Sequence, residues 1–337
     1  MLEVERLSIR FGEAFAVREA SLSVAPGERV GIVGESGCGK SVLAASLLGL
    51  APEAARVAGS IRLSGAELVG ASERRWRSHR GRDIAMVFQE PMSALNPLRR
   101  IGQILAEPII LHQGLSRTAA EGRVLALLDE VGLPDPRARL SQFPHQLSGG
   151  QRQRVLIALA LAADPSILIA DEPTTALDAN MAVRIVDLLV DLTRSRGMGL
   201  IFISHDLGVV ARATERVIVM YGGDIVETGP TRGTLEAPRH PYTAGLLAAR
   251  PSIARAGAVR TRLSTIPGTV PPVGRRAPGC PFSGRCAVEL PRCAGERPLS
   301  LDLGQGARAA CHRLADAGPV DDFDAAVAAG RATEAVR

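Results

Sequence analysis

The sequence contains few aromatic residues, few cysteines and no long apolar run. Phe, Trp and Tyr make up 3% of it, so a core has to be built mainly from Ala, Leu, Val and Ile, and the hydrophobic content of 46% is enough for a sizeable one. The longest apolar candidate, residues 155–170, is interrupted by Asp164 and Pro165 before it reaches the roughly 18 residues that span a bilayer. The first residues carry charges where a secretory signal needs an apolar stretch. We therefore expect a cytoplasmic protein whose thiols stay reduced.

The net charge of +5 comes largely from clusters of arginine. A basic balance permits nucleic acid, phospholipid or nucleotide partners but does not choose among them. The most basic stretch, residues 72–82, favours a solvated helix face. Charge alone therefore assigns no function.

Strand and helix patterns alternate through most of the chain. Short alternating runs before residue 33 indicate strands joined by turns. The apolar runs 167–171 and 200–204 are typical of buried parallel strands, and residues 98–163 are helical in character. This alternation predicts an α/β domain with a mainly parallel sheet.

A phosphate-binding loop follows the strand that ends near residue 33. The stretch GESGCGKS fits the pattern GxxxxGK[ST], in which glycines let backbone N–H groups point at phosphate and the next helix adds its positive dipole end. We expect Lys40 to reach the β- and γ-phosphates and Ser41 to bind Mg²⁺. Cys38 is expected to fill space in the loop. The nucleotide-binding candidates here are Gly34, Glu35, Ser36, Gly37, Cys38, Gly39, Lys40 and Ser41.

Two carboxylates end the apolar run 167–171. We expect Asp171 to hold Mg²⁺ and Glu172 to activate the attacking water as a general base, because strand ends are where open α/β sheets bind ligands. A second anion-binding helix start follows in LSGGQ, residues 147–151. One nucleotide does not need two such sites from one chain, so this segment is expected to cover the nucleotide of a partner molecule.

Six segments occur in the order typical of ABC transporter ATPases, and about the first 230 residues therefore resemble that family. They are the phosphate loop, VFQEP, LSGGQ, LIADEP, ALD and ISHD. The resemblance implies ATP and Mg²⁺ as cofactors, with Gln89 touching Mg²⁺ and sensing the membrane partner. His205 becomes the switch histidine at the γ-phosphate, and Phe11 the aromatic residue that stacks on adenine. The resemblance also implies that the γ-phosphate is contacted across a dimer by Ser148, Gly149, Gly150 and Gln151. The implied D-loop consists of Ala176, Leu177 and Asp178.

The same resemblance implies the fold class and the domain bounds. It implies an α/β, ABC-type P-loop ATPase with a RecA-like mixed sheet core, an antiparallel β subdomain, an α-helical subdomain and a loop-rich C-terminal extension with the cysteines. We expect the ATPase domain over residues 1–235, with its helical subdomain at about 91–162. The extension is expected over 236–315 and a disordered tail over 316–337.

Three stretches are similar to the oligopeptide and dipeptide importer branch of that family: QEPMSALNPLRRIG, ADEPTTALD and HPYT, residues 240–243. This implies an ATPase that couples hydrolysis in a head-to-tail dimer to peptide import, at the cytoplasmic face of the membrane. The implied partners are a sister ATPase in a heterodimer, two permease subunits and an extracytoplasmic peptide-binding protein, but no nucleic acid. A groove around Gln89 and residues 91–110 would receive a short permease helix.

An ABC-type ATPase that acts on nucleic acid is the main alternative, and the arginine-rich segments favour it slightly. Such proteins usually carry two cassettes or a large insertion, and this chain has one cassette and no such insertion. A kinase or GTPase is discounted because LSGGQ has no use there.

Four of the five cysteines lie close together near the C-terminus. Disulfides are rare in a reducing compartment, and structural zinc usually shows closer cysteine pairs. The spacing leaves zinc, an iron–sulfur cluster and unligated thiols open. Resemblance to the importer extension implies a structural [4Fe–4S] cluster on Cys280, Cys286, Cys293 and Cys311.

Overall fold

A computed structural model describes residues 1–89, 94–175, 177–250 and 265–316. Its larger sheet has eight strands in the order β11-β12-β10-β9-β3-β8-β7-β6. The strands β3, β6, β7, β8 and β9 pair in parallel, and β10, β11 and β12 continue the sheet antiparallel. The bounds are β3 Arg29–Val33, β6 Ile84–Val87, β7 Ile167–Asp171, β8 Gly199–Ile203, β9 Arg216–Tyr221, β10 Asp224–Pro230, β11 Ser300–Asp302 and β12 Arg308–Ala310.

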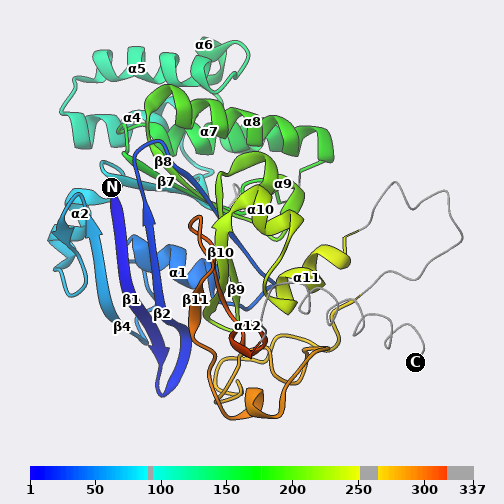
Figure 1. Cartoon of the computed structure of the whole chain (residues 1–337). Coiled ribbons are helices and arrows are strands. Elements are labelled where there is room, and N and C mark those ends of the chain that lie inside the picture. The colour runs from blue at the N-terminus through cyan, green and yellow to red at the C-terminus, as the bar shows by residue number, and fades with distance from the viewer. Residues whose placement is uncertain (90–93, 176, 251–264, 317–337) are drawn as a thin grey trace, which may run out of the picture.

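A smaller antiparallel sheet lies beside the first, in the order β2-β1-β4-β5 (Figure 1). Apolar residues alternate along β1 and β2, so one face of the sheet is buried in the same core as α1. The bounds are β1 Leu2–Phe11, β2 Ala14–Val24, β4 Ala55–Leu63 and β5 Ala66–Glu67.

Helices gather at one end of the molecule and around the larger sheet (Figure 1). Ser116 and Asp178 cap the starts of α5 and α8 with their side chains, and Gly197 ends α8 in the left-handed conformation. The bounds are α1 Lys40–Leu47, α2 Glu73–His79, α4 Ile101–Gln113, α5 Arg117–Glu130, α6 Pro136–Arg139, α7 Gly149–Leu161, α8 Ala179–Arg196, α9 Leu207–Ala213, α10 Thr231–Glu236, α11 Pro241–Ala248 and α12 His312–Asp316, with 3₁₀ turns η1 Pro144–Gln146 and η3 Pro291–Ala294.

The predicted fold class is confirmed: a mixed sheet core, an antiparallel sheet and a helical region are all present. The domain bounds stay a prediction. Helices α4 to α7 fall within the predicted helical subdomain, whereas residues 90–93 and the predicted tail from 317 onward lie outside the described residues. In the described part of the chain, no helix is both long and apolar enough to cross a membrane.

The region after residue 236 does not stand apart from the ATPase sheet. Strand β12 pairs with β10, so two strands near the C-terminus extend the sheet that begins with β3. Tyr242, Phe282 and Cys293 belong to the same apolar core as the helical region. The extension is therefore built onto the sheet's edge and buries apolar residues in the common core.

Candidate functional site

The phosphate loop connects β3 to α1 and is shaped by glycines. Gly34 has φ +154°, and a Cβ there would lie 2.2 Å from the Met220 carbonyl oxygen. Gly39 has φ +103°, and a Cβ there would lie 2.6 Å from the Ala16 carbonyl oxygen. Side chains at either position would push the loop away from its neighbours, so both glycines are required for this backbone path.

Lys40 folds over the loop's own backbone. Its Nζ donates to the carbonyl oxygens of Gly34 at 2.7 Å and Glu35 at 3.1 Å, and lies 3.7 Å from Cys38 Sγ. The ammonium group is thus held inside the loop, where a bound phosphate would compete with these carbonyls for it. Cys38 is fully buried, and burial raises the pKa of its thiol. It fills space below the loop as a neutral thiol.

The remaining central candidates follow the carboxyl ends of neighbouring parallel strands. The sheet order β3-β8-β7-β6 brings the phosphate loop after β3, His205 near the end of β8, Asp171 and Glu172 at the end of β7, and Gln89 after β6 to one edge. Parallel strands explain this convergence, because their carboxyl ends share one edge. The sheet therefore brings together the residues that the sequence separates by more than 170 positions.

Glu172 is held in an unusual backbone conformation. Its backbone φ angle is +47°, a value that residues other than glycine rarely adopt. Its N–H donates to the Ile203 carbonyl oxygen at 2.9 Å. The carboxylate Oε2 accepts from Thr175 Oγ1 at 2.8 Å and lies 3.1 Å from His205 Nδ1. Burial raises the pKa of Glu172, but the bonds from Thr175 and His205 and the nearby positive charges outweigh it, so the pKa is lowered. The carboxylate is ionised at neutral pH, as a general base must be.

Asp171 differs from Glu172 although they are adjacent. The pKa of Asp171 is raised, mainly by burial and in addition by the Glu172 charge. A hydrogen bond from the Ser41 hydroxyl and the Lys40 charge lower the pKa but do not cancel this rise. The Asp171 Oδ1 is buried and has no hydrogen-bond partner among the described residues. A buried carboxylate oxygen without a hydrogen-bond partner lowers the stability of the fold unless a cation binds to it. The Ser41 hydroxyl interacts with Asp171, and Gln89 follows the neighbouring strand β6; oxygen atoms of these residue types are the ligands that Mg²⁺ prefers, so their chemistry fits this ion.

The LSGGQ segment forms the start of α7. Ser148 Oγ accepts from the Gln151 N–H at 3.3 Å, and the Ser148 N–H donates to Gln151 Oε1 at 2.9 Å, which is a capping box. Ser148 and Gly149 are exposed, while Gly150 packs so closely on Met181 that a Cβ would lie 2.8 Å from the Met181 side chain. The first two residues of the segment are therefore open to solvent, while Gly150 is packed against α8.

Two further predicted residues lie at element ends. Asp178 is exposed, and its Oδ1 accepts from the Met181 N–H at 2.9 Å as the N-cap of α8. Phe11 is partly exposed at the end of β1, where it pairs with Ala14 across the turn to β2. Ala176 of the predicted D-loop, and Glu90 and Pro91 of the VFQEP stretch, lie outside the described residues.

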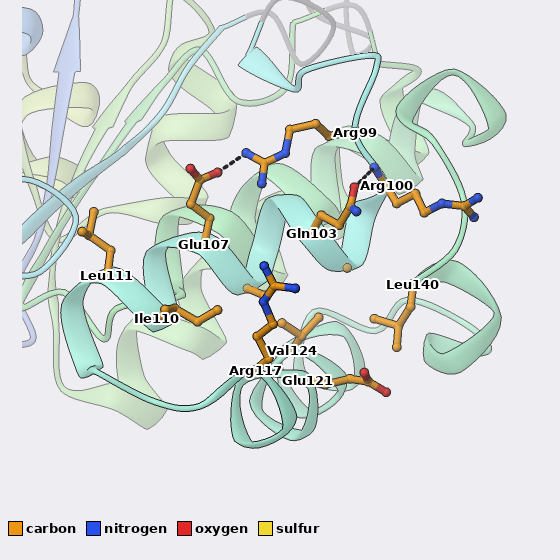
Figure 2. A pocket seen from close by; sticks show the side chains of 12 residues that line it. Arg99, Arg100, Gln103, Glu107, Ile110, Leu111, Arg117, Glu121, Val124 and Leu140 are labelled. Atoms are coloured by element: carbon orange, nitrogen blue, oxygen red, sulfur yellow. Dashed lines mark hydrogen bonds and ion pairs between the residues drawn. The ribbon is translucent and has the colours of Figure 1, made fainter.

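A pocket of about 650 Å³ opens between α4 and α5 in the helical region (Figure 2). Arg99 forms an ion pair with Glu107 across its rim, and the Arg100 N–H donates to Gln103 Oε1 at 3.1 Å. Leu111 is 74% exposed beside it. The lining residues are Arg99, Arg100, Gly102, Gln103, Ala106, Glu107, Ile110, Leu111, Arg117, Glu121, Val124 and Leu140.

The predicted iron–sulfur cluster is wrong. Across the described residues, no group of three or more His, Cys, Asp or Glu side chains is arranged to hold a metal ion. The four C-terminal cysteines are free, and they line a pocket of about 10 Å³, which holds at most about one water. Burial raises the pKa of Cys280 to about 11 and of Cys286 to about 12, which favours neutral thiols over thiolate ligands.

The physical premise of that prediction also fails. A structural cluster would be needed to hold together an extension with too little core of its own. Instead, the Phe282 ring packs edge-on against Tyr221 at 5.0 Å between centroids, and the extension shares the main apolar core. Packing against the ATPase sheet stabilises this region, and the thiols serve as small packing side chains, of which Cys280 and Cys293 are buried and Cys286 and Cys311 partly buried.

Sequence reasoning missed the side chains that support the site from a distance. Thr175 donates to Glu172, Tyr242 accepts from the Glu35 N–H at 2.7 Å, and Arg285 pairs with the Glu35 carboxylate. Thr175 lies three residues after Glu172, and Tyr242 belongs to the HPYT stretch, so both carried a local signal. Arg285 lies 250 residues from Glu35 and carried none.

Comparisons with known proteins agree with this geometry. The ABC transporter family model matches residues 17–175, and the model for the oligopeptide/dipeptide transporter C-terminal region matches residues 226–293. The dipeptide transport ATP-binding protein DppD of Escherichia coli is 44% identical over 96% of this chain and 98% of its own length. A putative peptide import ATP-binding protein of Brucella abortus is 46% identical over 91% of this chain and 94% of its own length.

Solved structures are also similar. The dimeric bacterial ABC transporter cassette MJ0796 has a TM-score of 0.61 and 30% identity, covering 69% of this chain and 100% of its own. A post-hydrolysis state of the same cassette, dimeric and bound to ADP and phosphate, matches equally well. These relatives support the importer prediction and give no support to the nucleic-acid alternative.

Proposed function

The chain belongs to the ATP-binding subunits of ABC transporters for oligopeptides and dipeptides, and on this premise we propose that it hydrolyses ATP to drive peptide uptake through a membrane permease. The observation that carries this proposal is the convergence of the phosphate loop, Asp171, Glu172 and His205 at one sheet edge. The ionised Glu172 carboxylate accepts a proton from the attacking water, and His205 lies beside it to contact the γ-phosphate.

The nucleotide is proposed to bind along residues 34–41, with adenine on Phe11. Lys40 exchanges the Gly34 and Glu35 carbonyls for phosphate oxygens. Ser41, Asp171 and Gln89 would hold Mg²⁺, which when bound neutralises the charge that develops on the phosphates. Glu172 is kept in place by Thr175 and by the backbone bond to Ile203, so the base is oriented before the nucleotide arrives.

A complete site is proposed to need a second ATPase subunit. Ser148 and Gly149 are exposed at the start of α7. Within the described residues, the hydrogen bonds of Ser148 are all with residues of the same helix start. A head-to-tail dimer would place this helix start on the phosphates of the partner, with Gln151 and Asp178 at the same interface. The dimeric cassettes among the similar structures support a dimer, and we propose a sister ATPase as the second subunit.

The permease is proposed to dock on the helical region. The α4–α5 pocket offers an apolar floor with an arginine-rich rim, and Leu98 and Leu111 are 86% and 74% exposed nearby. Such an apolar patch is typical of a surface that binds another protein. Docking there would keep the ATPase at the inner face of the membrane, next to two permease subunits that receive peptide from an extracytoplasmic binding protein.

The Glu172→Gln substitution tests the proposed function. It keeps the side-chain shape and removes the base, so ATP should still bind while turnover falls by at least about a hundredfold. Peptide uptake by cells that depend on this subunit should be lost in parallel. Both ATP turnover and uptake of a labelled dipeptide are measured with the assembled transporter.

The matched control is Glu236→Gln, because Glu236 is an exposed glutamate whose ion pair, within the described residues, is with Arg232 on the same helix α10. It should leave both turnover and uptake unchanged. Turnover of Glu172→Gln within about tenfold of wild type, a barrier change of about 1.4 kcal/mol, would contradict the role of Glu172 as base.

A further inference from the structure

The C-terminal extension contacts the phosphate loop directly through Arg285. Its Nη1 lies 2.7 Å from Glu35 Oε2 and its Nη2 lies 3.2 Å from Glu35 Oε1, which is a two-pronged pairing of guanidinium and carboxylate. The Arg285 side chain is 8% exposed, and Nη1 also lies 3.1 Å from the Tyr221 hydroxyl. A doubly bonded ion pair in which the arginine is buried and the glutamate partly buried is geometrically specific, unlike the exposed pairs elsewhere on the surface.

All three kinds of polar group on Glu35 are engaged. The N–H donates to the Tyr242 hydroxyl at 2.7 Å, the carbonyl oxygen accepts from Lys40 Nζ at 3.1 Å, and the carboxylate pairs with Arg285. Two of these three partners, Tyr242 and Arg285, belong to the extension. The Tyr242 ring is fully buried and packs against Tyr221 at 4.7 Å between centroids, so its hydroxyl is fixed in position.

A second arginine of the extension reaches the other side of the same loop. Arg276 Nη1 donates to the Phe15 carbonyl oxygen at 2.7 Å and to the Gly222 carbonyl oxygen, and its Nη2 lies 3.4 Å from the Gly37 carbonyl oxygen. It thereby joins strand β2, the turn between β9 and β10, and the phosphate loop. The loop is contacted by the extension at both Glu35 and Gly37.

The charge of Glu35 explains why this contact matters for nucleotide binding. A carboxylate within a phosphate-binding loop repels the phosphates of ATP, and the repulsion is strong where water is partly excluded. Arg285 neutralises that charge from the side of the extension. Lys40 contacts only the backbone carbonyl of Glu35 in the hydrogen bonds of the described residues, so the carboxylate held by Arg285 leaves the ammonium group to phosphate.

We propose that Arg285 and Tyr242 are positioning residues of the ATP site, through which the C-terminal extension sets the affinity of the phosphate loop for nucleotide. This inference rests on the proposed ATP site at residues 34–41. Arg285 cancels the Glu35 charge, and Tyr242 fixes the Glu35 N–H in the loop conformation that binds phosphate. The extension is thus a part of the nucleotide site as well as an appendage to the ATPase.

Binding of MgATP to full-length variants by calorimetry tests the proposal. Arg285→Met should raise the ATP Kd by about tenfold, the scale of one charge-assisted bond, while kcat at saturating ATP stays near wild type in the assembled transporter. Arg285→Lys keeps the charge and should recover part of the affinity. Tyr242→Phe keeps the ring and should raise the Kd by about threefold, because the Glu35 N–H loses its acceptor.

The control for general damage is Arg297→Met. Arg297 also forms an ion pair between the extension and the sheet, with Asp224, and among the described residues it makes no hydrogen bond or ion pair with the phosphate loop. It should lower thermal stability and leave the ATP Kd within about twofold of wild type. An equal loss of affinity in Arg297→Met and Arg285→Met would overturn the proposal.

A double variant separates charge from folding. Glu35→Gln combined with Arg285→Met removes both charges, so it should bind ATP more tightly than Arg285→Met alone. A double variant that binds no better would overturn the neutralising role of Arg285, and unchanged Kd values in both Arg285→Met and Tyr242→Phe would overturn the positioning role altogether. A wild-type chain that bound no ATP would instead reject the proposed function itself.

Discussion

The start of α7 and the cysteine segment of the extension, residues 280–311, differ in how far their side chains are exposed to solvent. At α7, Ser148 and Gly149 are exposed at the helix start. In the extension, Cys280 and Cys293 are buried, and their thiols face a pocket hardly larger than one water. The first region is arranged for another molecule and the second for the interior of this one. Substitutions in the two regions should therefore affect different measurements.

The largest effect is expected at Ser148. In a mixed dimer, Ser148→Arg in this chain should reduce hydrolysis at the partner's ATP site by at least about a hundredfold, because a bulky cation replaces the donors at the γ-phosphate. The site built on this chain's own phosphate loop should still bind ATP. Site-specific hydrolysis is measured in dimers in which only one phosphate loop is intact.

Ser116→Arg is the matched control for Ser148. Ser116 caps α5 as Ser148 caps α7, so its loss should cost a similar stability of about 1 kcal/mol without touching hydrolysis. If the mixed dimer with Ser148→Arg keeps hydrolysis at the partner's site, the head-to-tail arrangement is wrong.

An intermediate effect is expected inside the junction between β10 and the extension. Glu227 is 3% exposed and accepts from the Arg239 N–H at 2.7 Å and the His240 N–H at 3.0 Å. Burial raises the pKa of Glu227 to about 7. The folded state then binds more protons than the unfolded state between about pH 4.5 and 7, so the stability of the neutral form is lost as the pH rises through this window.

Urea unfolding of wild type and Glu227→Gln at pH 5 and pH 8 measures this loss. The wild type should lose on the order of 3 kcal/mol more than the variant between the two pH values, because Gln does not ionise. Burial lowers the pKa of His240 to about 3, so His240 stays neutral across the range. Equal pH dependence in the two proteins would show that Glu227 does not titrate there.

The smallest effect of a substitution, on stability alone, is expected in the cysteine segment. Cys280→Ala should lower the free energy of unfolding by about 1 kcal/mol, because it removes a buried sulfur from a packed site. ATP binding and hydrolysis should not change, in contrast with Ser148→Arg. A loss of nucleotide binding at unchanged stability would mean that the two regions are less separate than their exposure indicates.

The sequence predicts those parts of the site in which the residues that act together are close together in the chain. The phosphate loop needs glycines, Lys40 and Ser41 in one short stretch, and parallel strand ends bring Asp171 to it by a general rule of α/β sheets. The cysteine prediction failed because spacing carries no information about burial. Whether a thiol is a ligand or a packing group depends on its surroundings, such as the Phe282 ring, which come from distant elements.

Arg285 could not have been predicted for a related reason. One arginine in a stretch rich in Pro, Gly and Arg has no local pattern that marks it. Its role follows from the path of the chain past β9, which places it beside Tyr221 and Glu35. Long-range ion pairs of this kind require the fold before the partner is known, whereas capping boxes such as Ser148 with Gln151 can be read from four residues.

The pairing of β12 with β10 has a consequence for protein synthesis. Strand β10 ends at Pro230, and its neighbour β12 ends at Ala310, about 80 residues later. Ribosomes add roughly 5–20 residues per second, so the β10 edge is left uncovered for roughly 4 to 16 seconds while the rest of the chain emerges. An open strand edge invites pairing with other chains. The nascent ATPase is therefore vulnerable to association until β12 is synthesised, and the interval between β10 and β12 sets how long a chaperone has to shield this edge.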